Sequence, residues 1–228
     1  MTLPRVSLVR RNDTHRLIPS KYSDGGVSVL DRIADDAGHL QDIFDLDHAT
    51  NDRLLAENDL LPGIRLHELV FGVPYYQIVN AAFCHAHPLG SRFNSSDRGA
   101  WYAAFQLRAS QAEVAYHKSI ELAEIEWEEE EEVTYDDYLA DFSANFHDVR
   151  GDPDFADCLS PDSYEASQRL AQSLLNAGAL GVVYPSVRRS GATCIACFRP
   201  PVVGNVRKGK TYRFVWEGNP APKIQVIA

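Results

Sequence analysis

The sequence predicts an α+β fold, in which helices lie irregularly among short strands instead of alternating with them regularly. Two observations carry this prediction. Helical spacing of apolar residues is confined to a few separate segments, and the last quarter of the chain contains β-branched or aromatic runs divided by Gly, Pro and Asn. Because 228 residues with 45% apolar content can bury a substantial core, we expect residues 1–228 to form one domain.

The first third of the chain gives the weakest local signals. Residues 15–22, HRLIPSKY, are expected to be extended, because Pro19 has a fixed φ and disfavours a helix at the residue before it. Apolar residues between 30 and 57 recur at helical spacing with breaks, which favours a helical hairpin.

The middle of the chain predicts a strand followed by a helix. Residues 99–105, GAWYAAF, form an aromatic run typical of a strand. Ser110 and Glu113 match the capping box, in which a serine and a glutamate three residues later satisfy free N–H groups at a helix start, so we expect a helix from Ser110 to about Glu126. The glutamates at 128–132 repel one another, which favours a solvated loop.

The remaining elements follow from clearer boundary signals. Residues 133–149 are ambiguous, with a strand favoured for their second half. Ser160 and Pro161 form a typical helix start and Gly178 a typical stop, so we expect a helix at 161–177. Four strands complete the prediction: LGVVYPS (180–186), ATCIACF (192–198), YRFVWEG (212–218) and KIQVIA (223–228).

The formal net charge is −10, and the charges are distributed unevenly. Residues 121–165 contain 17 acidic side chains and one basic side chain, whereas residues 187–213 contain seven basic side chains and no acidic one. Because nucleic-acid phosphates repel an acidic chain, we expect no direct binding of nucleic acid. An anionic substrate must therefore be bound by locally placed arginines.

Cysteine usage and hydropathy predict a cytoplasmic protein. Four cysteines in a chain of this length do not resemble the dense disulfide framework of a small secreted domain. The first residues, MTLPRVSLVRRNDTHR, lack the apolar core of a signal peptide, and no segment approaches the roughly 20 apolar residues of a membrane span. We therefore expect neither processing nor a membrane contact.

Residues 204–211, GNVRKGKT, satisfy the P-loop expression for a loop that binds nucleotide phosphates. A P-loop leads into a helix whose N-terminus meets the phosphate. This segment instead leads into the strand-like run at 212–218. We therefore reject a P-loop here and expect a basic hairpin loop.

The cysteines offer two further motifs. Cys194 and Cys197 have the spacing of a zinc or redox pair, but no second pair lies at ligand spacing, and their apolar neighbours favour buried, inert thiols. Cys84, His85 and His87 include a nucleophile and metal ligands, but no orienting carboxylate is identifiable nearby. We expect neither a metal site nor a cysteine nucleophile.

A candidate site lies between residues 90 and 117. Arg92, Tyr102 and Glu113 each have an ordinary explanation, as surface polar residues or, for Glu113, as part of the capping box. Together they supply an anion-binding fork, an aromatic stacking face and a carboxylate within one strand–helix unit.

A resemblance to a known family rests on several fragments in a fixed order. They are HRLIPS (15–20), GSRFN (90–94), Gly99-x-Trp-Tyr-Ala-Ala, Ala112-Glu113-x-x-x-His117 and GVVYPSVR (181–188) followed by CFRP (197–200). From residue 15 to about 217 the chain resembles the RES domain, which is named for its arginine, glutamate and serine. Compared with shorter members, residues 23–80 form a long insertion.

The resemblance implies a fold similar to the ADP-ribosyltransferases and diphtheria toxin. It implies an enzyme that degrades NAD, typically by phosphorolysis to nicotinamide and ADP-ribose 1″-phosphate. NAD is then a substrate and inorganic phosphate the co-substrate, with no resident cofactor and no metal. It also implies the toxin of a bacterial toxin–antitoxin pair, neutralised by an Xre-type helix-turn-helix antitoxin. Whether the chain forms a homo-oligomer stays open.

Carried over residue by residue, the resemblance implies a site made of Arg16, Arg92, Tyr102, Glu113 and Ser186. Glu113 would stabilise the positively charged ribose of the transition state. The two arginines would hold the pyrophosphate or the attacking phosphate. Tyr102 would stack on the nicotinamide ring, and Ser186 would hydrogen-bond the substrate or orient the carboxylate.

Two other classes of function stay open at this point. Protein ADP-ribosyltransferases and NAD glycohydrolases share the same scaffold, and the sequence does not choose between phosphate, water and a protein side chain as acceptor. A non-catalytic alternative is an interaction module whose acidic belt binds a basic partner. The intact arginine, glutamate and serine positions weigh against that alternative.

Overall fold

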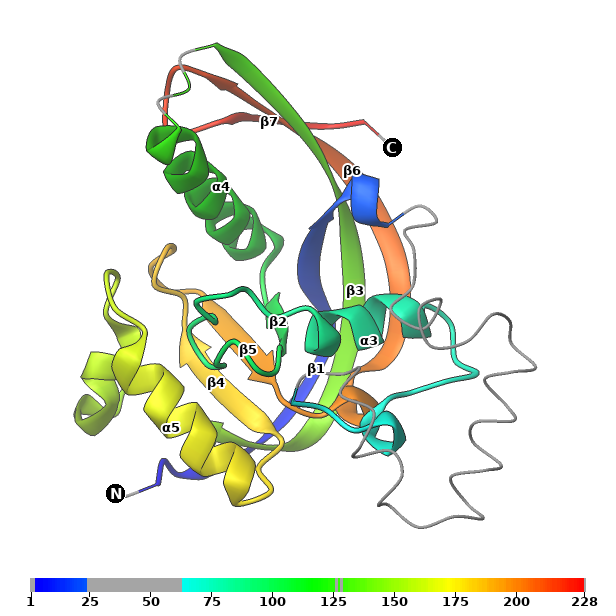
Figure 1. The fold of residues 1–228 in the computed structure, drawn as a ribbon, viewed down its shortest axis with the longest axis vertical. Coiled ribbons are helices and arrows are strands. Elements are labelled where there is room, and N and C mark those ends of the chain that lie inside the picture. Colours follow the sequence, from blue (N-terminus) through cyan, green and yellow to red (C-terminus); the bar gives the residue numbers. More distant parts are fainter. Residues whose placement is uncertain (1–2, 24–62, 126, 128, 228) are drawn as a thin grey trace.

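The computed structural model describes residues 3–23, 63–125, 127 and 129–227. Within them, seven strands form one sheet in the order β1-β2-β5-β4-β3-β6-β7, with three α-helices beside it (Figure 1). The strands are β1 (Val6–Pro19), β2 (Trp101–Ala104), β3 (Glu130–Asp148), β4 (Gly181–Pro185), β5 (Thr193–Cys197), β6 (Gly204–Glu217) and β7 (Lys223–Val226). The helices are α3 (Tyr76–Cys84), α4 (Leu107–Glu124) and α5 (Glu165–Asn176), with 3-10 turns η1 (Ser20–Tyr22), η3 (Leu66–Glu68), η4 (Pro153–Leu159) and η5 (Pro200–Val202). The predicted α+β class is confirmed.

The sheet opens next to β1. This strand pairs antiparallel with the long strand β3 along most of its length. Its pairing with β2, in contrast, is one residue pair, His15 with Ala104, within the part of the chain that the structure describes. Beyond this pair the two strands separate, so Arg16 lies at an opening between β1 and the short strands β2, β5 and β4.

Three clusters of buried apolar side chains hold the layers together. Because side chains alternate along a strand, β4 contributes to two clusters: Val183 packs with α3, and Val182 and Tyr184 pack with α5. A third cluster joins Leu122 of α4 to Leu17 of β1. Helix α4 thereby lies over the long strands, next to the opening of the sheet (Figure 1).

Helix α4 begins three residues earlier than predicted, which changes the interpretation of Glu113. The helix begins at Leu107 after the extended residue Gln106, and no side chain caps this end. The predicted capping box is therefore wrong. Ser110 lies inside the helix, where its Oγ accepts a hydrogen bond from the Leu17 N–H at 3.3 Å. The polar end of Glu113 is left available for another role.

The solvated loop predicted at 128–132 is wrong for its last three glutamates. β3 begins at Glu130, and this part of the strand pairs with β6. Cations offset the repulsion, because Lys118 Nζ lies 3.0 Å from a Glu131 oxygen and Arg213 Nε lies 3.1 Å from a Glu132 oxygen. The strand continues to Asp148, so the ambiguous segment is strand over nearly its whole length.

Helix α5 begins at Glu165, four residues later than predicted. The Ser160-Pro161 signal does not start a helix, because Ser160 instead caps the end of the 3-10 turn η4, whose last residue is Leu159. The turn η4 begins with a similar pair, a capping residue followed by a proline: the Asp152 side chain accepts a hydrogen bond from the Asp154 N–H at 3.1 Å, and Pro153 is the first residue of the turn. Residues 160–164 therefore link η4 to α5.

The predicted end of α5 is confirmed. Gly178 has a φ of +77°, a conformation that glycine adopts without steric cost. Its N–H donates to the Leu175 carbonyl at 3.0 Å, and the Ala179 N–H donates to the Leu174 carbonyl at 2.9 Å. These two bonds form the Schellman motif that closes many helices.

Residues 204–211 lie within β6, and a strand continues after them. The rejection of a P-loop is confirmed, because no helix begins at Thr211. The predicted basic hairpin loop is wrong, since the segment is itself part of the sheet. Its irregularity is instead seen as shifts of register against β3.

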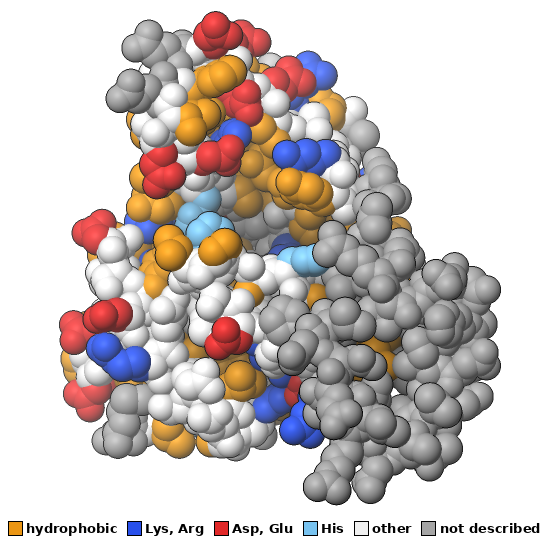
Figure 2. Space-filling model, in the orientation of Figure 1, with side chains coloured by type: hydrophobic (Ala, Val, Ile, Leu, Met, Phe, Trp, Pro, Cys, Tyr) orange, Lys and Arg blue, Asp and Glu red, His pale blue; other side chains and the backbone are white. Residues whose placement is uncertain are grey.

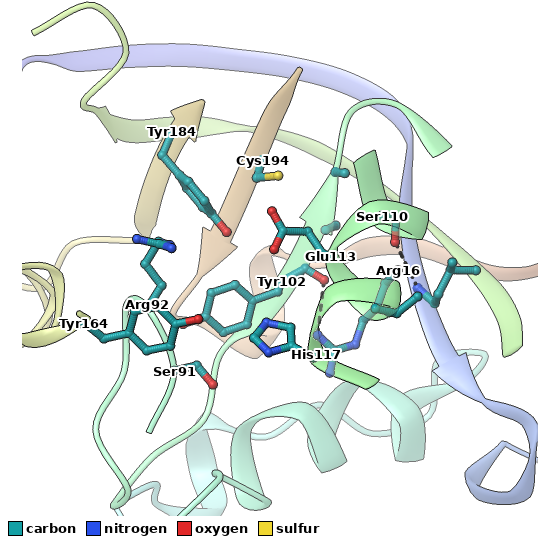
Figure 3. Close-up of a pocket in the computed structure, with 14 residues that line it drawn as sticks. Arg16, Ser91, Arg92, Tyr102, Ser110, Glu113, His117, Tyr164, Tyr184 and Cys194 are labelled. Carbon is teal, nitrogen blue, oxygen red and sulfur yellow. Dashed lines mark hydrogen bonds between the residues drawn. The ribbon is translucent and has the colours of Figure 1, made fainter. Parts of the chain in front are cut away.

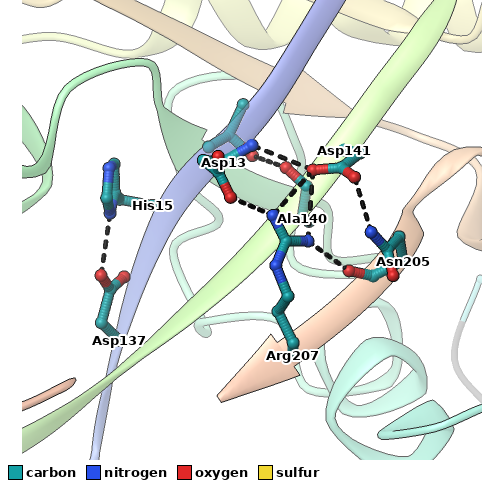
Figure 4. A network of polar contacts seen from close by, with 8 residues as sticks. Asp13, His15, Asp137, Ala140, Asp141, Asn205 and Arg207 are labelled. Carbon is teal, nitrogen blue, oxygen red and sulfur yellow. Dashed lines mark hydrogen bonds and ion pairs between the residues drawn. The ribbon is translucent and has the colours of Figure 1, made fainter. Parts of the chain in front are cut away.

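Asp141 organises the bulged region where β1, β3 and β6 meet (Figure 4). Its carboxylate accepts from the Asp13 N–H at 2.9 Å, Asn205 Nδ2 at 2.8 Å and Arg207 at 3.2 Å. Asp13 and Asn205 both have positive φ, which these residue types tolerate better than most. Desolvation alone would raise the pKa of Asp141, but these donors outweigh it and lower that pKa overall.

The N-terminal predictions are partly testable. The extended chain predicted at 15–22 is confirmed up to Pro19 and is wrong for residues 20–22, which form η1. The helical hairpin predicted between 30 and 57 lies outside the described residues, as does most of the insertion at 23–80. Helix α3 was not predicted. None of the helices that the structure describes is long and apolar enough to cross a membrane.

Candidate functional site

A cavity of about 250 Å³ lies at the opening between β1 and β2 (Figure 3). Arg16, Arg92, Tyr102 and Glu113 line it, and Ser186 contacts Glu113 directly. The structure therefore brings together all five residues of the predicted site, although they come from β1, two loops, β2 and α4. In the space-filling view, histidine side chains gather next to a hollow below α4 (Figure 2).

Glu113 is the acidic group of the cavity. Ser186 Oγ donates a hydrogen bond to its Oε1 at 3.1 Å, and the carboxylate points toward Tyr184 and Cys194 (Figure 3). Burial raises the pKa of Glu113. The Ser186 hydroxyl and the charges of Arg188 and Arg92 oppose this rise, because they stabilise the ionised form. Glu113 is thus a carboxylate held away from most solvent, next to positive charge.

Arg16 reaches across the opening of the sheet. Its Nη1 donates to the Tyr102 carbonyl at 3.1 Å, and its guanidinium lies 5.0 Å from the centre of the Trp101 ring. Its Nε is buried and has no hydrogen-bond partner among the described residues. Burial lowers the pKa of Arg16 to about 10, so the group stays charged at neutral pH. Arg16 thus lines the cavity as a buried cation with one donor that has no partner among the described residues.

Arg92 is almost fully buried, with 7% of its surface exposed. Its Nη1 donates to the carbonyl of Cys158 at 3.1 Å and to that of Ser160 at 2.7 Å. The guanidinium also lies 4.8 Å from the ring centre of Tyr164. The free fork expected from the sequence is therefore partly engaged by the backbone, and within the described chain only Nη1 donates.

Tyr102 has a structural role that the sequence did not indicate. Its hydroxyl donates to Asn94 Oδ1 and accepts from the Phe93 N–H, both at 2.8 Å. Burial raises the pKa of Tyr102 well above its ordinary value, so the phenol stays neutral. The hydroxyl holds the loop that carries Arg92, while the ring lines the cavity.

Ser186 directly follows β4, in the loop that returns to β5. Its backbone N–H donates to the Ala192 carbonyl at 2.8 Å, which closes this loop. The side chain is buried and its Oγ is aimed at Glu113. Of the two roles that the resemblance implies for Ser186, the geometry favours orientation of the carboxylate.

The cavity wall includes further residues that were not part of the predicted site. Among them are Ser91, His117, Tyr164 and Tyr184. His117 follows Glu113 by four residues in α4, so helical spacing places both on one face. Burial, Arg188 and Arg92 lower the pKa of His117. No local pattern indicates Tyr164, because it reaches the cavity through the link between η4 and α5.

Burial raises the pKa of every cysteine in the chain. All four are free and buried, which confirms the burial predicted for Cys194 and Cys197. Burial raises the pKa of Cys194, the thiol in the cavity wall, to about 12 and that of Cys84 to about 11. A thiol with so high a pKa is almost entirely protonated near neutral pH. Among the described residues, no three His, Cys, Asp or Glu side chains are grouped so that they could hold a metal ion.

The arrangement combines a carboxylate, two guanidinium groups and aromatic walls. A carboxylate in a partly dry pocket stabilises positive charge that develops on a substrate. Arginine donors beside it bind phosphate oxygens. Fold and site thus define an α+β protein with a pocket that combines a carboxylate with two guanidinium groups, which suits a ligand with an anionic part and a part that becomes cationic.

Comparisons with known proteins identify the family. The model of the RES domain matches residues 65–217, so the chain belongs to the RES domain family. The chain is 29% identical over 211 residues to "Uncharacterized protein y4oC" of Sinorhizobium fredii (strain NBRC 101917 / NGR234), covering 91% of this chain and 84% of that protein. A chain of the M. tuberculosis MbcT-MbcA toxin-antitoxin complex aligns with a TM-score of 0.43 and 15% identity, over 58% of this chain and 73% of that one. Arg16 precedes the matched residues, and the structure places it beside those within them.

Proposed function

We propose that this protein degrades NAD by cleaving the bond between nicotinamide and ribose, with inorganic phosphate as the acceptor. The observation that carries the proposal is the position of Glu113, a carboxylate bound by Ser186 at 3.1 Å in a cavity that also contains Arg16 and Arg92. Membership of the RES domain family supports it. The products are nicotinamide and ADP-ribose 1″-phosphate.

The chemistry follows from the charge of the substrate. The nicotinamide ring of NAD is cationic, so it takes the electron pair of the breaking C–N bond and leaves as a neutral molecule. Positive charge then develops on the ribose carbon, and the Glu113 carboxylate stabilises it. A phosphate oxygen forms the new C–O bond. The reaction needs neither a proton added to the leaving group nor a metal, because the cationic nicotinamide departs as a neutral molecule.

The other side chains of the cavity bind and orient the substrate. Arg16 lines the cavity, where its guanidinium contributes positive charge for the phosphate oxygens of NAD. Arg92 contributes positive charge and the donors that the backbone does not engage. The ring of Tyr102 forms a stacking surface for nicotinamide. Ser186 holds the carboxylate toward the ribose.

The wider assignments rest on the family resemblance. We propose that the fold is related to the ADP-ribosyltransferases and diphtheria toxin, and that the protein is the toxin of a bacterial toxin–antitoxin pair with an Xre-type antitoxin. We propose a cytoplasmic site of action, where NAD is available. A fall in cellular NAD on expression, abolished by Glu113→Gln, is the outcome that would agree with a toxin of this kind.

The direct test incubates the purified protein with NAD, with and without inorganic phosphate, and identifies products by mass. ADP-ribose 1″-phosphate formed only with phosphate is the expected result. ADP-ribose in both buffers would instead indicate a glycohydrolase, and ADP-ribose attached to added protein would indicate a protein ADP-ribosyltransferase. NAD left intact under all conditions would contradict the proposal and favour the interaction module.

The Glu113→Gln variant tests the role of the carboxylate. Its amide oxygen still accepts from Ser186 Oγ, so the fold should be retained, but it cannot carry the negative charge. We expect kcat to fall by about 100-fold or more, as when a group that stabilises transition-state charge is removed. Full activity with an unchanged melting temperature would exclude the carboxylate role.

A further inference from the structure

Two arginines hold the same short segment of backbone against the cavity. We call residues 158–164, which run from the end of η4 to the start of α5, the strap. Arg92 Nη1 donates to the carbonyls of Cys158 at 3.1 Å and Ser160 at 2.7 Å. Arg188 Nη2, from the loop after β4, donates to the carbonyl of Pro161 at 2.8 Å. Three strap carbonyls therefore accept hydrogen bonds from guanidinium groups.

The two guanidinium groups must lie close to each other. They donate to carbonyls of consecutive residues, Ser160 and Pro161, at 2.7 and 2.8 Å. Consecutive carbonyl oxygens are at most about 5 Å apart, so the two donor nitrogens lie within about 10 Å. A diphosphate that accepts one hydrogen bond at each end spans a similar distance. One diphosphate can therefore reach both arginines.

Arg188 is held in place and its charge reaches the cavity. Its guanidinium carbon lies 3.4 Å from the ring centre of Tyr116 on α4, which fixes the plane of the group. Within the described chain it donates a side-chain hydrogen bond through Nη2, to the strap. Its positive charge favours the ionised form of Glu113 and the neutral form of His117. Arg188 is thus a half-buried cation near the cavity, bound to one neutral carbonyl. A guanidinium group binds an anionic oxygen more strongly than it binds a neutral carbonyl oxygen.

We infer that Arg188, together with Arg92, binds the diphosphate of the substrate, and that in the unliganded protein the strap carbonyls occupy these donors in its place. The identity of the substrate rests on the proposed function. Binding exchanges neutral acceptors for charged oxygens, which form stronger bonds with arginine. The strap then moves away from the arginines as the diphosphate enters.

Inorganic pyrophosphate tests this inference without turnover. Its affinity for the intact protein is measured by calorimetry for the wild type, Arg188→Gln and a control, Arg169→Gln. Arg169 lies on α5, is 69% exposed and pairs with Glu165, so its loss removes the same charge away from the cavity. We expect Arg188→Gln to weaken binding by roughly 10- to 100-fold and the control by less than about threefold. Equal affinities of Arg188→Gln and wild type, or no binding to the wild type, would overturn the inference.

A pair of substrates separates binding of the anion from positioning of the strap. NAD carries the diphosphate, whereas nicotinamide riboside has the same cleavable bond and no phosphate. We expect Arg188→Gln to lower kcat/KM for NAD at least about 10-fold more than kcat/KM for nicotinamide riboside, because any effect of Arg188 on the charge of Glu113 is common to both substrates. Equal losses with both substrates would show that Arg188 only positions the strap. Failure of the proposed function is distinguishable, because the wild type would then bind pyrophosphate without consuming NAD.

Discussion

The Ser186→Ala substitution is expected to move the acid limb of the pH–rate profile to higher pH. Burial raises the pKa of Glu113, and among the influences that oppose this rise the hydrogen bond from Ser186 is the largest. Removing the hydroxyl therefore raises the pKa of the carboxyl further. The proposed reaction needs Glu113 ionised, so activity falls as the pH drops through this pKa, and in the variant it falls sooner.

The size of the shift follows from the strength of the lost bond. A hydrogen bond to a charged group contributes about 1.5 to 3 kcal/mol, and about 1.4 kcal/mol corresponds to one pH unit. The Ser186–Glu113 bond is moderately long at 3.1 Å, which places it near the lower end of this range. We expect the limb to move upward by about one pH unit.

The assay measures kcat/KM for NAD between about pH 4 and pH 9, because this range brackets the carboxyl and imidazole groups of the site. Ser173→Ala is the control: its hydroxyl donates to a backbone carbonyl within α5, away from the cavity, so its profile should match the wild type. An acid limb in Ser186→Ala that coincides with the wild type, or moves to lower pH, would refute the proposed effect of this hydrogen bond.

Two further predictions concern stability. Tyr102→Phe removes the hydroxyl that bonds Phe93 and Asn94, so the free energy of unfolding in urea should fall by about 1 to 3 kcal/mol; an unchanged value would show that the loop is held otherwise. The lowered pKa of Asp141 means that its ionised form stabilises the fold above the ordinary carboxyl pKa and that this contribution is lost as the pH falls through the lowered pKa. Asp141→Asn should therefore melt at a lower temperature than the wild type at neutral pH, with the difference shrinking toward acid pH, and a constant difference would contradict this account.

Strands could be predicted where a run of apolar residues along the chain is enough to bury the strand. The apolar runs that became β2, β4 and β5 are buried on both faces, so their composition alone indicates them. Helix α3 carries no such signal, because the residue before it, Tyr75, has a φ of +59° and no side chain caps the helix. The glutamates at the start of β3 are paired with Lys118 of α4 and Arg213 of β6, so the charges that offset their repulsion cannot be found in the local sequence.

The candidate site was only partly predictable for a related reason. The capping box at Ser110 was a valid local pattern, but the Leu17 N–H from β1 uses that hydroxyl instead. The pairing of Glu113 with Ser186 joins residues 73 positions apart, and the resemblance to the RES domain implied it where spacing could not. Tyr164 and the engagement of Arg92 by the strap depend on tertiary packing alone.

The cavity at the opening of the sheet is built from distant parts of the chain, and this decides when it can form during synthesis. Arg16 leaves the ribosome about 120 residues before its partner in register on β3, Tyr138, and about 170 before Ser186. At typical elongation rates this interval lasts roughly 10 to 30 s. A nascent chain that ends before Ser186 lacks the partner of Glu113, so the candidate site cannot be complete until β4 and Ser186 have emerged from the ribosome.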